Sequence, residues 1–420
     1  MKKFLFASLL VVSFAVNAQE VKKDEITKEV VRVLDSIKKV KEGEKKKTSF
    51  PYYNSTKGLG FTAHDSLFQR NIGFRIQSRA GFFKTEDKEG TVEGEVRRMR
   101  LKFDGFVYNP KFGYKLELGF SAGDLGVIKA GENQNVILDA VFFYKPNKNW
   151  TVAFGQTKLP GNNQRVVSSG SLEFTDRTIN NSAFNIDRDF GVFIDYAKHD
   201  ADLFSYTLKG AVTKGEGRNW TKTKDDGVCL TGKAELFPLG TFTKNGSYFE
   251  GDLVREKTMK WMVSGAYSQN NNTVRTQGQL GSDLYEARTL KSLFFDTMLK
   301  YNGWAASGSF MSRMTDNPIT VDPLDNTKTR LVVAGQGIDT QLSYMFPSKY
   351  QVAGRYSILK ADDKVETLVP DIEEVAISFS KYILDHKLKV QTECSYENKN
   401  YFAGNTTGSW YVRFQVEIGI

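Results

Sequence analysis

A two-residue alternation of apolar and charged side chains runs through most of this chain of 420 residues. At the C-terminal end, for example, every second position from 410 to 420 is apolar, while Arg413 and Glu417 lie between these positions. Successive side chains of a β-strand point to opposite faces, so the alternation indicates strands with one apolar and one charged face. The chain is therefore expected to be mainly β-structure.

The length of these segments indicates where the apolar face lies. Many run to ten residues or more, which is about what a tilted strand needs to cross a bilayer, whereas strands of soluble proteins average nearer five or six. We expect strands to begin near residues 72, 94, 111, 136, 149, 189, 202, 228, 259, 291, 303, 333, 349, 373, 387 and 409. This pattern predicts a transmembrane, antiparallel, up-and-down β-barrel of about 16 strands over residues 71–420. The alternative is a large soluble β-sandwich or β-propeller.

The links between these segments alternate in length. Short links such as 109–111 and 146–148 are followed by long ones such as 122–135 and 159–187. Outer-membrane barrels have short turns at the periplasmic end and long loops at the other, and an even number of strands places both chain ends at the short-turn end. The link 237–256 is long where a short turn is due, and the sequence offers no explanation for it.

Composition agrees with a barrel. Aromatic residues make up 13% of the chain, including 31 Phe and 18 Tyr, and the chain is too polar on average for a helical membrane protein. The net charge of +9 is spread along an exported chain and does not indicate nucleic acid. Aromatic side chains stand at the ends of segments, where interfacial girdles form. They are Tyr108, Tyr144, Trp150, Tyr301, Trp304, Tyr344, Tyr350 and Trp410.

The N-terminal part divides into three stretches. Residues 1–18 carry two Lys, an apolar run and a small-residue cleavage pattern, which predicts a secretory signal peptide. In 19–50 apolar residues recur at spacings of 4, 3, 4 and 3 from Ile26 to Val40, which predicts a short periplasmic coiled-coil helix. β-branched residues in that seam favour trimers or tetramers over dimers. A flexible basic tether is the alternative, and 51–70 is expected to be a linker.

Basic residues occur repeatedly on the face that a barrel turns toward its lumen. Arg or Lys on the lipid face would cost about 2–4 kcal/mol at the bilayer midplane, which fixes this orientation. The first two strands contribute Arg75, Arg79, Arg98, Arg100 and Lys102. Fixed positive charge along a water-filled wall favours anions, so these residues predict an anion pathway. Lumen acids such as Asp104 and Glu117 leave weak selectivity as an equally good alternative.

The longest loop, 159–187, also contains or adjoins basic residues. They are Lys158, Arg165, Arg177 and Arg188. Loops of this length inside a compact fold usually have a function, and we expect this one to fold inward and narrow the lumen. An ordinary outer loop is the alternative. We expect a short helical turn at 171–177.

Several motifs of this region resemble the phosphate-selective porin O/P family. They are RRMRLKF at 97–103, ILDA at 137–140, FGQTK at 154–158, LEFTDR at 172–177 and DRDFGV at 187–192. The resemblance implies an outer-membrane homotrimer of sixteen-stranded barrels for small anionic solutes such as phosphate, with Arg98, Arg100 and Lys102 on the wall and Lys158, Arg177 and Arg188 around the constriction. The family often has Pro-Phe after the Gly-Gln-x-Lys run. Here residues 159–163 read LPGNN, so the pore-facing loop and the phosphate selectivity can differ.

Other classes of function have weaker support. The three histidines, His64, His199 and His386, fall before the barrel or in short turns, and no serine-hydrolase, zinc-protease or phosphate-loop motif is present. We therefore expect a channel for passive diffusion in the outer membrane of a Gram-negative bacterium, with no enzymatic activity, metal or cofactor. An uptake barrel for oligosaccharides or peptides, or an anchor for surface structures, is the alternative.

Overall fold

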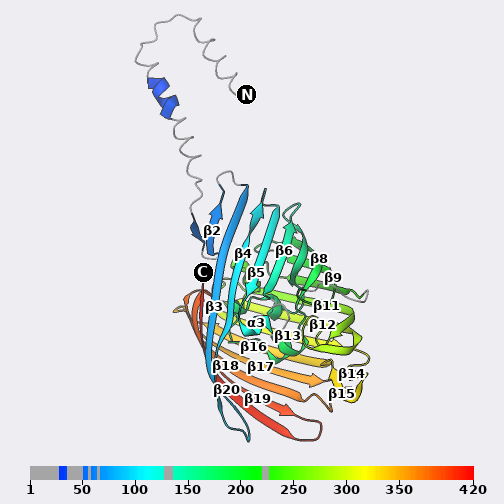
Figure 1. Cartoon of the computed structure of the whole chain (residues 1–420). Helices are drawn as coiled ribbons and strands as arrows, with labels where there is room; N and C mark the ends of the chain where they lie inside the picture. The colour runs from blue at the N-terminus through cyan, green and yellow to red at the C-terminus, as the bar shows by residue number, and fades with distance from the viewer. Residues whose placement is uncertain (1–27, 36–50, 55–57, 64–66, 127–135, 220–226) are drawn as a thin grey trace, which may run out of the picture. The chain divides into compact units, whose positions relative to one another are not determined.

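The computed structural model describes residues 28–35, 51–54, 58–63, 67–126, 136–219 and 227–420. Sixteen antiparallel strands form a closed barrel (Figure 1), as the alternation predicted. The barrel strands are β3(Phe68–Thr85), β4(Thr91–Val107), β5(Phe112–Gly119), β6(Ile137–Tyr144), β7(Trp150–Lys158), β8(Arg188–Lys198), β9(Ser205–Thr213), β10(Cys229–Phe237), β11(Lys260–Arg275), β12(Asp283–Tyr301), β13(Trp304–Met314), β16(Gly335–Met345), β17(Tyr350–Ala361), β18(Asp371–Leu384), β19(Leu388–Asn400) and β20(Thr406–Gly419).

The first and last barrel strands close the sheet. β20 pairs with β3 from Ser409–Thr85 to Gly419–Arg75 (Figure 1, red beside blue). Beyond the end of β20, the short strand β2(Gly58–Thr62) continues along β3 and pairs in turn with β1(Tyr52–Asn54). The segment 51–70, expected to be a linker, thus contributes two short strands.

The structure describes only a part of the chain before the first barrel strands. This part includes a helix at 28–35, which lies within the predicted coiled-coil segment. The rest of that segment and the predicted signal peptide lie outside the described residues. In the part of the chain that the structure describes, no helix is both long and apolar enough to span a membrane.

The outer surface of the barrel shows why the strands form where they do. Outward side chains such as Phe142, Phe295 and Ile377 are at least half exposed, while their neighbours along each strand face inward. Aromatic rings pair across neighbouring strands at the short-turn end. The pairs are Tyr108–Phe112, Phe112–Tyr144, Trp150–Tyr196, Trp304–Tyr344 and Tyr350–Phe379. Such a ring of aromatics is typical of a membrane interface.

At the long-loop end, some strands extend further than the alternation indicated. β12 begins at Asp283 rather than near residue 291, and β11 continues to Arg275, so this loop is only 276–282. Beyond the lipid, strand residues no longer need an apolar face, so the alternation ends while the backbone ladder continues. Another loop contains its own hairpin, formed by β14(Ile319–Asp322) and β15(Asp325–Leu331).

One side of the barrel interior is filled with apolar side chains. The loop 159–187 contains α4(Asn163–Val166), a 3-10 turn η1(Ser169–Ser171) and α5(Ile179–Phe184). Its Leu159 and Phe184 belong to a buried cluster with the inward-facing Phe193, Phe294 and Met311 of the wall. The loop therefore packs against the wall as part of a core, and the remaining interior lies toward β3–β7.

Candidate functional site

A β-bulge in β4 concentrates arginines on the lumen face. Gln77 of β3 pairs with Arg98, but its neighbour Ser78 pairs with Val96, so Arg97 is an extra residue in β4. A bulge of this kind puts two consecutive side chains on the same face. Arg97 and Arg98 accordingly both point inward, although strict alternation would place Arg97 in the lipid.

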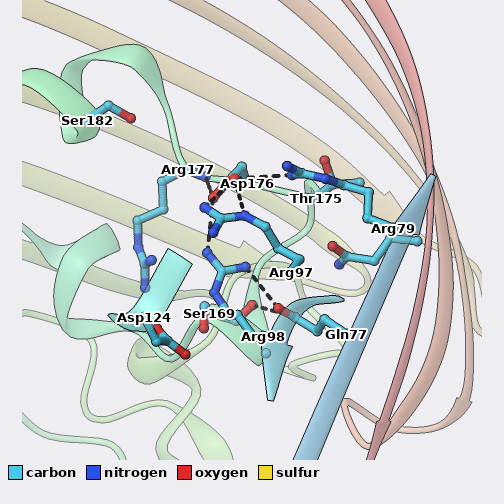
Figure 2. Close-up of polar contacts among 12 residues, drawn as sticks. Gln77, Arg79, Arg97, Arg98, Asp124, Ser169, Thr175, Asp176, Arg177 and Ser182 are labelled. Atoms are coloured by element: carbon cyan, nitrogen blue, oxygen red, sulfur yellow. Dashed lines mark hydrogen bonds and ion pairs between the residues drawn. The ribbon is translucent and has the colours of Figure 1, made fainter. Parts of the chain in front are cut away.

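These arginines bind a carboxylate of the loop 159–187, called the inner loop below. Figure 2 shows the guanidinium groups of Arg79, Arg97 and Arg98 turned toward Asp176. Their nitrogens lie 3.2, 2.8 and 3.1 Å from its carboxylate oxygens. Burial alone would raise the pKa of the Asp176 carboxyl, but the charges of Arg98, Arg97 and Arg79 outweigh it and hold this pKa well below the usual range. Asp176 is therefore an ionised anchor between the loop and β3–β4.

The same loop segment is also bound to the part of the wall that lies beyond β20 from β3. The backbone N–H of Thr175 donates to Glu393 of β19 at 2.7 Å, and Arg355 of β17 donates to the carbonyl of Asp176 at 3.1 Å. Further along, Asn180 donates to Asp339 of β16 at 2.8 Å. The loop thus crosses the lumen from β7 to β16–β19.

The helical turn expected at 171–177 is absent. η1 ends at Ser171 and α5 begins only at Ile179. The residues between them bond to wall side chains instead of to their own backbone, as the N–H of Thr175 does. Here tertiary contacts override the local preference of the sequence.

A second set of contacts surrounds Arg100. Arg100 binds Asp124 of α3(Ala122–Leu125), with its nitrogens 2.5 and 2.8 Å from the carboxylate, and Glu117 at 3.2 Å. Arg188 and Lys115 share Asp139 at 2.9 and 2.5 Å. These pairs link the start of β8 to β5 and β6, so the cations are held in place rather than free to swing.

Between this wall and the loop lies a cavity of about 350 Å³. Its charged lining has seven cationic side chains and two carboxylates. The cations are Arg75, Arg100, Lys102, Lys115, Lys158, Arg188 and Lys387. The carboxylates are Glu117 and Glu417. A water-filled space with such a lining lowers the energy of an anion relative to a cation.

Five of the nine residues predicted from the sequence line this cavity, and four do not. Those in the lining are Arg75, Arg100, Lys102, Lys158 and Arg188. Of the others, Arg79 and Arg98 bind Asp176, while Arg165 pairs with Asp187 and Arg177 bonds within the loop.

Many of these cations are neutralised by nearby acids. Lys102 lies 3.0 Å from Asp104, and Arg75 lies 3.7 Å from Glu417. The sequence left weak selectivity open, with lumen acids balancing the lumen cations. These ion pairs show that such balancing occurs in part of the wall.

Among the nine predicted cations, Lys158 and Arg177 differ from the others, since the side chain of neither forms a salt bridge within the described part of the chain. The Lys158 ammonium donates to the carbonyls of Arg165, Val166 and Val167 at 2.8–3.3 Å. Arg177 donates to the carbonyls of Gln164 and Val167 at 2.8 and 2.9 Å.

These unneutralised charges lie close to other cations. Burial, and then the positive charges of Arg165 and Arg98, lower the pKa of the Arg177 guanidinium well below its ordinary value. The wall and loop cations thus act on one another across the lumen.

Sequence reasoning missed several residues of this site. Arg97 was not singled out as a site residue, because strict alternation places it on the outer face and the bulge that turns it inward leaves no mark in the alternation. Lys115, Asp124 and Asp139 were not singled out as site residues. The lumen-facing pattern of β5 and β6 could have indicated Lys115 and Asp139, whereas Asp124 lies in a loop helix that the pattern does not place.

Comparison with known proteins gives a partial match to one family and a shared fold. Residues 71–252 match the model of the family Phosphate-selective porin O and P. No curated protein sequence matches the chain.

Solved outer-membrane proteins share the fold at low sequence identity. The outer membrane channel DcaP of Acinetobacter baumannii is 12% identical, with a TM-score of 0.52 over 86% of this chain and 99% of that one. OprB of Pseudomonas putida is 9% identical, with a TM-score of 0.53 over 84% and 94%. OmpF of Salmonella typhi, solved with daunomycin, is 14% identical, with a TM-score of 0.52 over 84% and 99%.

Proposed function

We propose that this chain, whose residues 71–252 match the Phosphate-selective porin O and P family, is an outer-membrane diffusion channel that prefers small anions such as phosphate. The family match and the sixteen-stranded barrel support an outer-membrane porin channel. The preference for anions rests on one observation: cationic side chains outnumber carboxylates in the lining of the cavity beneath the inner loop.

The geometry suggests how such a preference would arise. A solute that passes the inner loop meets the wall cations Arg75 and Arg100 on one side and Lys158 on the other. Because salt bridges already hold most of these groups, the field acting on the solute comes from the surplus positive charge. The unneutralised Lys158 and Arg177 supply part of that surplus, so the proposed selectivity is moderate and electrostatic.

Reversal potentials in planar bilayers under a KCl gradient test this proposal. We expect the sign that corresponds to chloride permeating faster than potassium. The preference should weaken from about 0.1 M to about 1 M salt, because the Debye length falls from about 10 Å to about 3 Å. Cation preference would overturn the anionic assignment, and the absence of any conductance would overturn the channel.

The runner-up function is an uptake or anchoring barrel without strong anion selectivity. The neutralised pairs Lys102–Asp104 and Arg100–Glu117 favour it. Conductance with a reversal potential near zero, together with block by oligosaccharides or peptides, would support that reading.

We also propose that the chain forms a homotrimer, held in part by its N-terminal segment in the periplasm. Val30 and Val33 of the predicted seam lie in the helix 28–35 and are about half exposed, at 50% and 53%. Pairing of such seams between copies would bury them.

Deletion of residues 20–47 should therefore weaken the trimer on native gels while each barrel stays folded. A trimer of unchanged stability would make this segment a tether.

A further inference from the structure

The long link 238–259 at the short-turn end folds back into the barrel. It contains the 3-10 turn η2(Thr243–Tyr248). Lys300, on the inner face of β12, donates to the carbonyls of Gly246 and Phe249, both at 2.8 Å. Phe242 is buried in a cluster with inward-facing side chains of β10, β11 and β12. These contacts place the link inside the lumen, where it occupies space that a short turn would leave open.

Within the lumen, the link meets the inner loop 159–187 from the opposite direction. The backbone N–H of Glu250 donates to the carbonyl of Ser171 at 3.0 Å. The carboxylate of Glu250 accepts from the side chain of Gln164 at 3.0 Å and from the N–H of Glu173 at 2.8 Å. One residue of the link thus makes three hydrogen bonds to the loop.

This junction buries two carboxyl groups side by side. Glu173 is 2% exposed and Glu250 is 6% exposed. The side-chain amide of Gln341 donates to both carboxyl groups, and that of Gln351 donates to Glu173. Two buried carboxyl groups that share a donor do not readily ionise together, because the like charges repel and neither is well hydrated.

Charged groups of several elements face this pair. Lys300 of β12 and Lys389 of β19 supply positive charge, and the negative charges of Asp252 and Glu256 of the link act on Lys300. Further titratable neighbours are Tyr382 of β18, the His386 ring that contacts Tyr382 and Phe249, and Glu417 of β20, which lies 3.6 Å from Lys389. Both ammonium groups also donate to backbone carbonyls: Lys300 to the link, and Lys389 to Leu172 at 2.7 Å. Neither lysine therefore interacts with the carboxyl pair alone.

We propose that the link 238–259 is a second pore-narrowing element, in which Glu250 positions the inner loop through its contact with Glu173. Loss of the proton that the two carboxyl groups share releases the link. This proposal rests on the proposed channel function and adds to it a regulation of the same pore. It also accounts for the long link at an end where the other turns are short.

The direction of the pH effect follows from the state of Glu173. Burial, and then the charge of Glu250, raise the pKa of the Glu173 carboxyl from 4.5 to about 7. Because the pKa is higher in the docked state, protonation of Glu173 stabilises docking. This stabilisation is fully present below the ordinary pKa of 4.5 and is lost as the pH rises through about 7. The link is therefore docked in acid and released above neutrality.

Single-channel conductance of the full chain in planar bilayers, measured from about pH 4.5 to about pH 8.5, tests this inference. We expect conductance to rise across the window between 4.5 and about 7. The docking equilibrium should change by at most about tenfold per pH unit, as for one proton. Glu250→Gln and Glu173→Gln should each flatten the step.

The matched control is Asp202→Asn. Its carboxylate lies at the same end of the barrel, is 85% exposed and does not touch the pair, so the step should persist in this variant. Conductance that is unaffected by pH in the wild type would overturn this inference while leaving the channel intact. A step that survives in both glutamine variants would also overturn it. A complete lack of conductance in the wild type would instead overturn the channel on which it rests.

Discussion

Replacing Asp176 by asparagine is expected to loosen the inner loop 159–187 and to strengthen the preference for anions. Three arginines converge on this carboxylate, and the Arg98 side chain is only 5% exposed. Removing one partner of a buried ion pair costs about 3–5 kcal/mol. Since Asp176 is 24% exposed, we expect a smaller loss, about 2 kcal/mol, in the attachment of the loop to the wall.

Two changes should follow in bilayer recordings of Asp176→Asn. Conductance should rise and become noisier, because the loop loses its anchor to β3–β4. The reversal potential should shift further toward chloride, because one negative charge has left a group of three positive ones. Asp316→Asn, at an exposed position in a loop of the same end, is the control and should change neither property. An unchanged loop and reversal potential in the Asp176 variant would show that this contact does not shape the pore.

The second large effect is expected from Arg177→Glu. The Arg177 guanidinium forms no salt bridge within the described residues, and the positive charges of Arg165, Arg98 and Arg100 act on it. At a separation of about 8 Å, two unit charges interact with about 2 kcal/mol at an effective dielectric constant of about 20. Reversing one charge therefore changes the energy of an ion there by roughly 4 kcal/mol before screening.

The ratio of anion to cation permeability should consequently fall by more than tenfold at low salt, and the reversal potential should approach or cross zero. Arg177→Gln should produce about half of this shift, which separates charge from the loss of the bonds to Gln164 and Val167. Lys328→Glu, at a position 64% exposed in the β14–β15 hairpin, is the control for charge far from the constriction. Equal shifts in the control and the Arg177 variant would remove Arg177 from the pathway.

The sequence indicated the barrel because lipid imposes a strict rule on every membrane-spanning strand. Residues such as Phe295 and Ile377 must be apolar where they face acyl chains, and this requirement repeats along each strand. The rule stops at the edge of the membrane. It therefore did not show that β11 continues to Arg275 or that β2 extends along β3.

The contacts inside the barrel were harder to predict, because the same charged side chains can form ion pairs in several different arrangements. Alternation placed Arg98 and Arg100 inside, yet it gave no means of pairing Arg98 with Asp176 of a distant loop. The link at the short-turn end was anomalous in the sequence. Its meaning depends on a contact between Glu250 and Glu173, which lie far apart in the chain.

The bulge in β4 has a consequence for how this strand can change. Before the bulge, Glu93 and Glu95 face inward, and after it Arg98 and Arg100 do. Arg97 is thus an extra residue between two stretches of β4. In the first stretch the odd-numbered side chains face the lumen, and in the second the even-numbered ones do. Losing it would leave a strand in which every second side chain faces the lumen without a break. A single-residue deletion normally exchanges the two faces of a membrane strand on one side of the cut. At this position, the deletion would leave both faces unchanged and would lengthen the regular ladder.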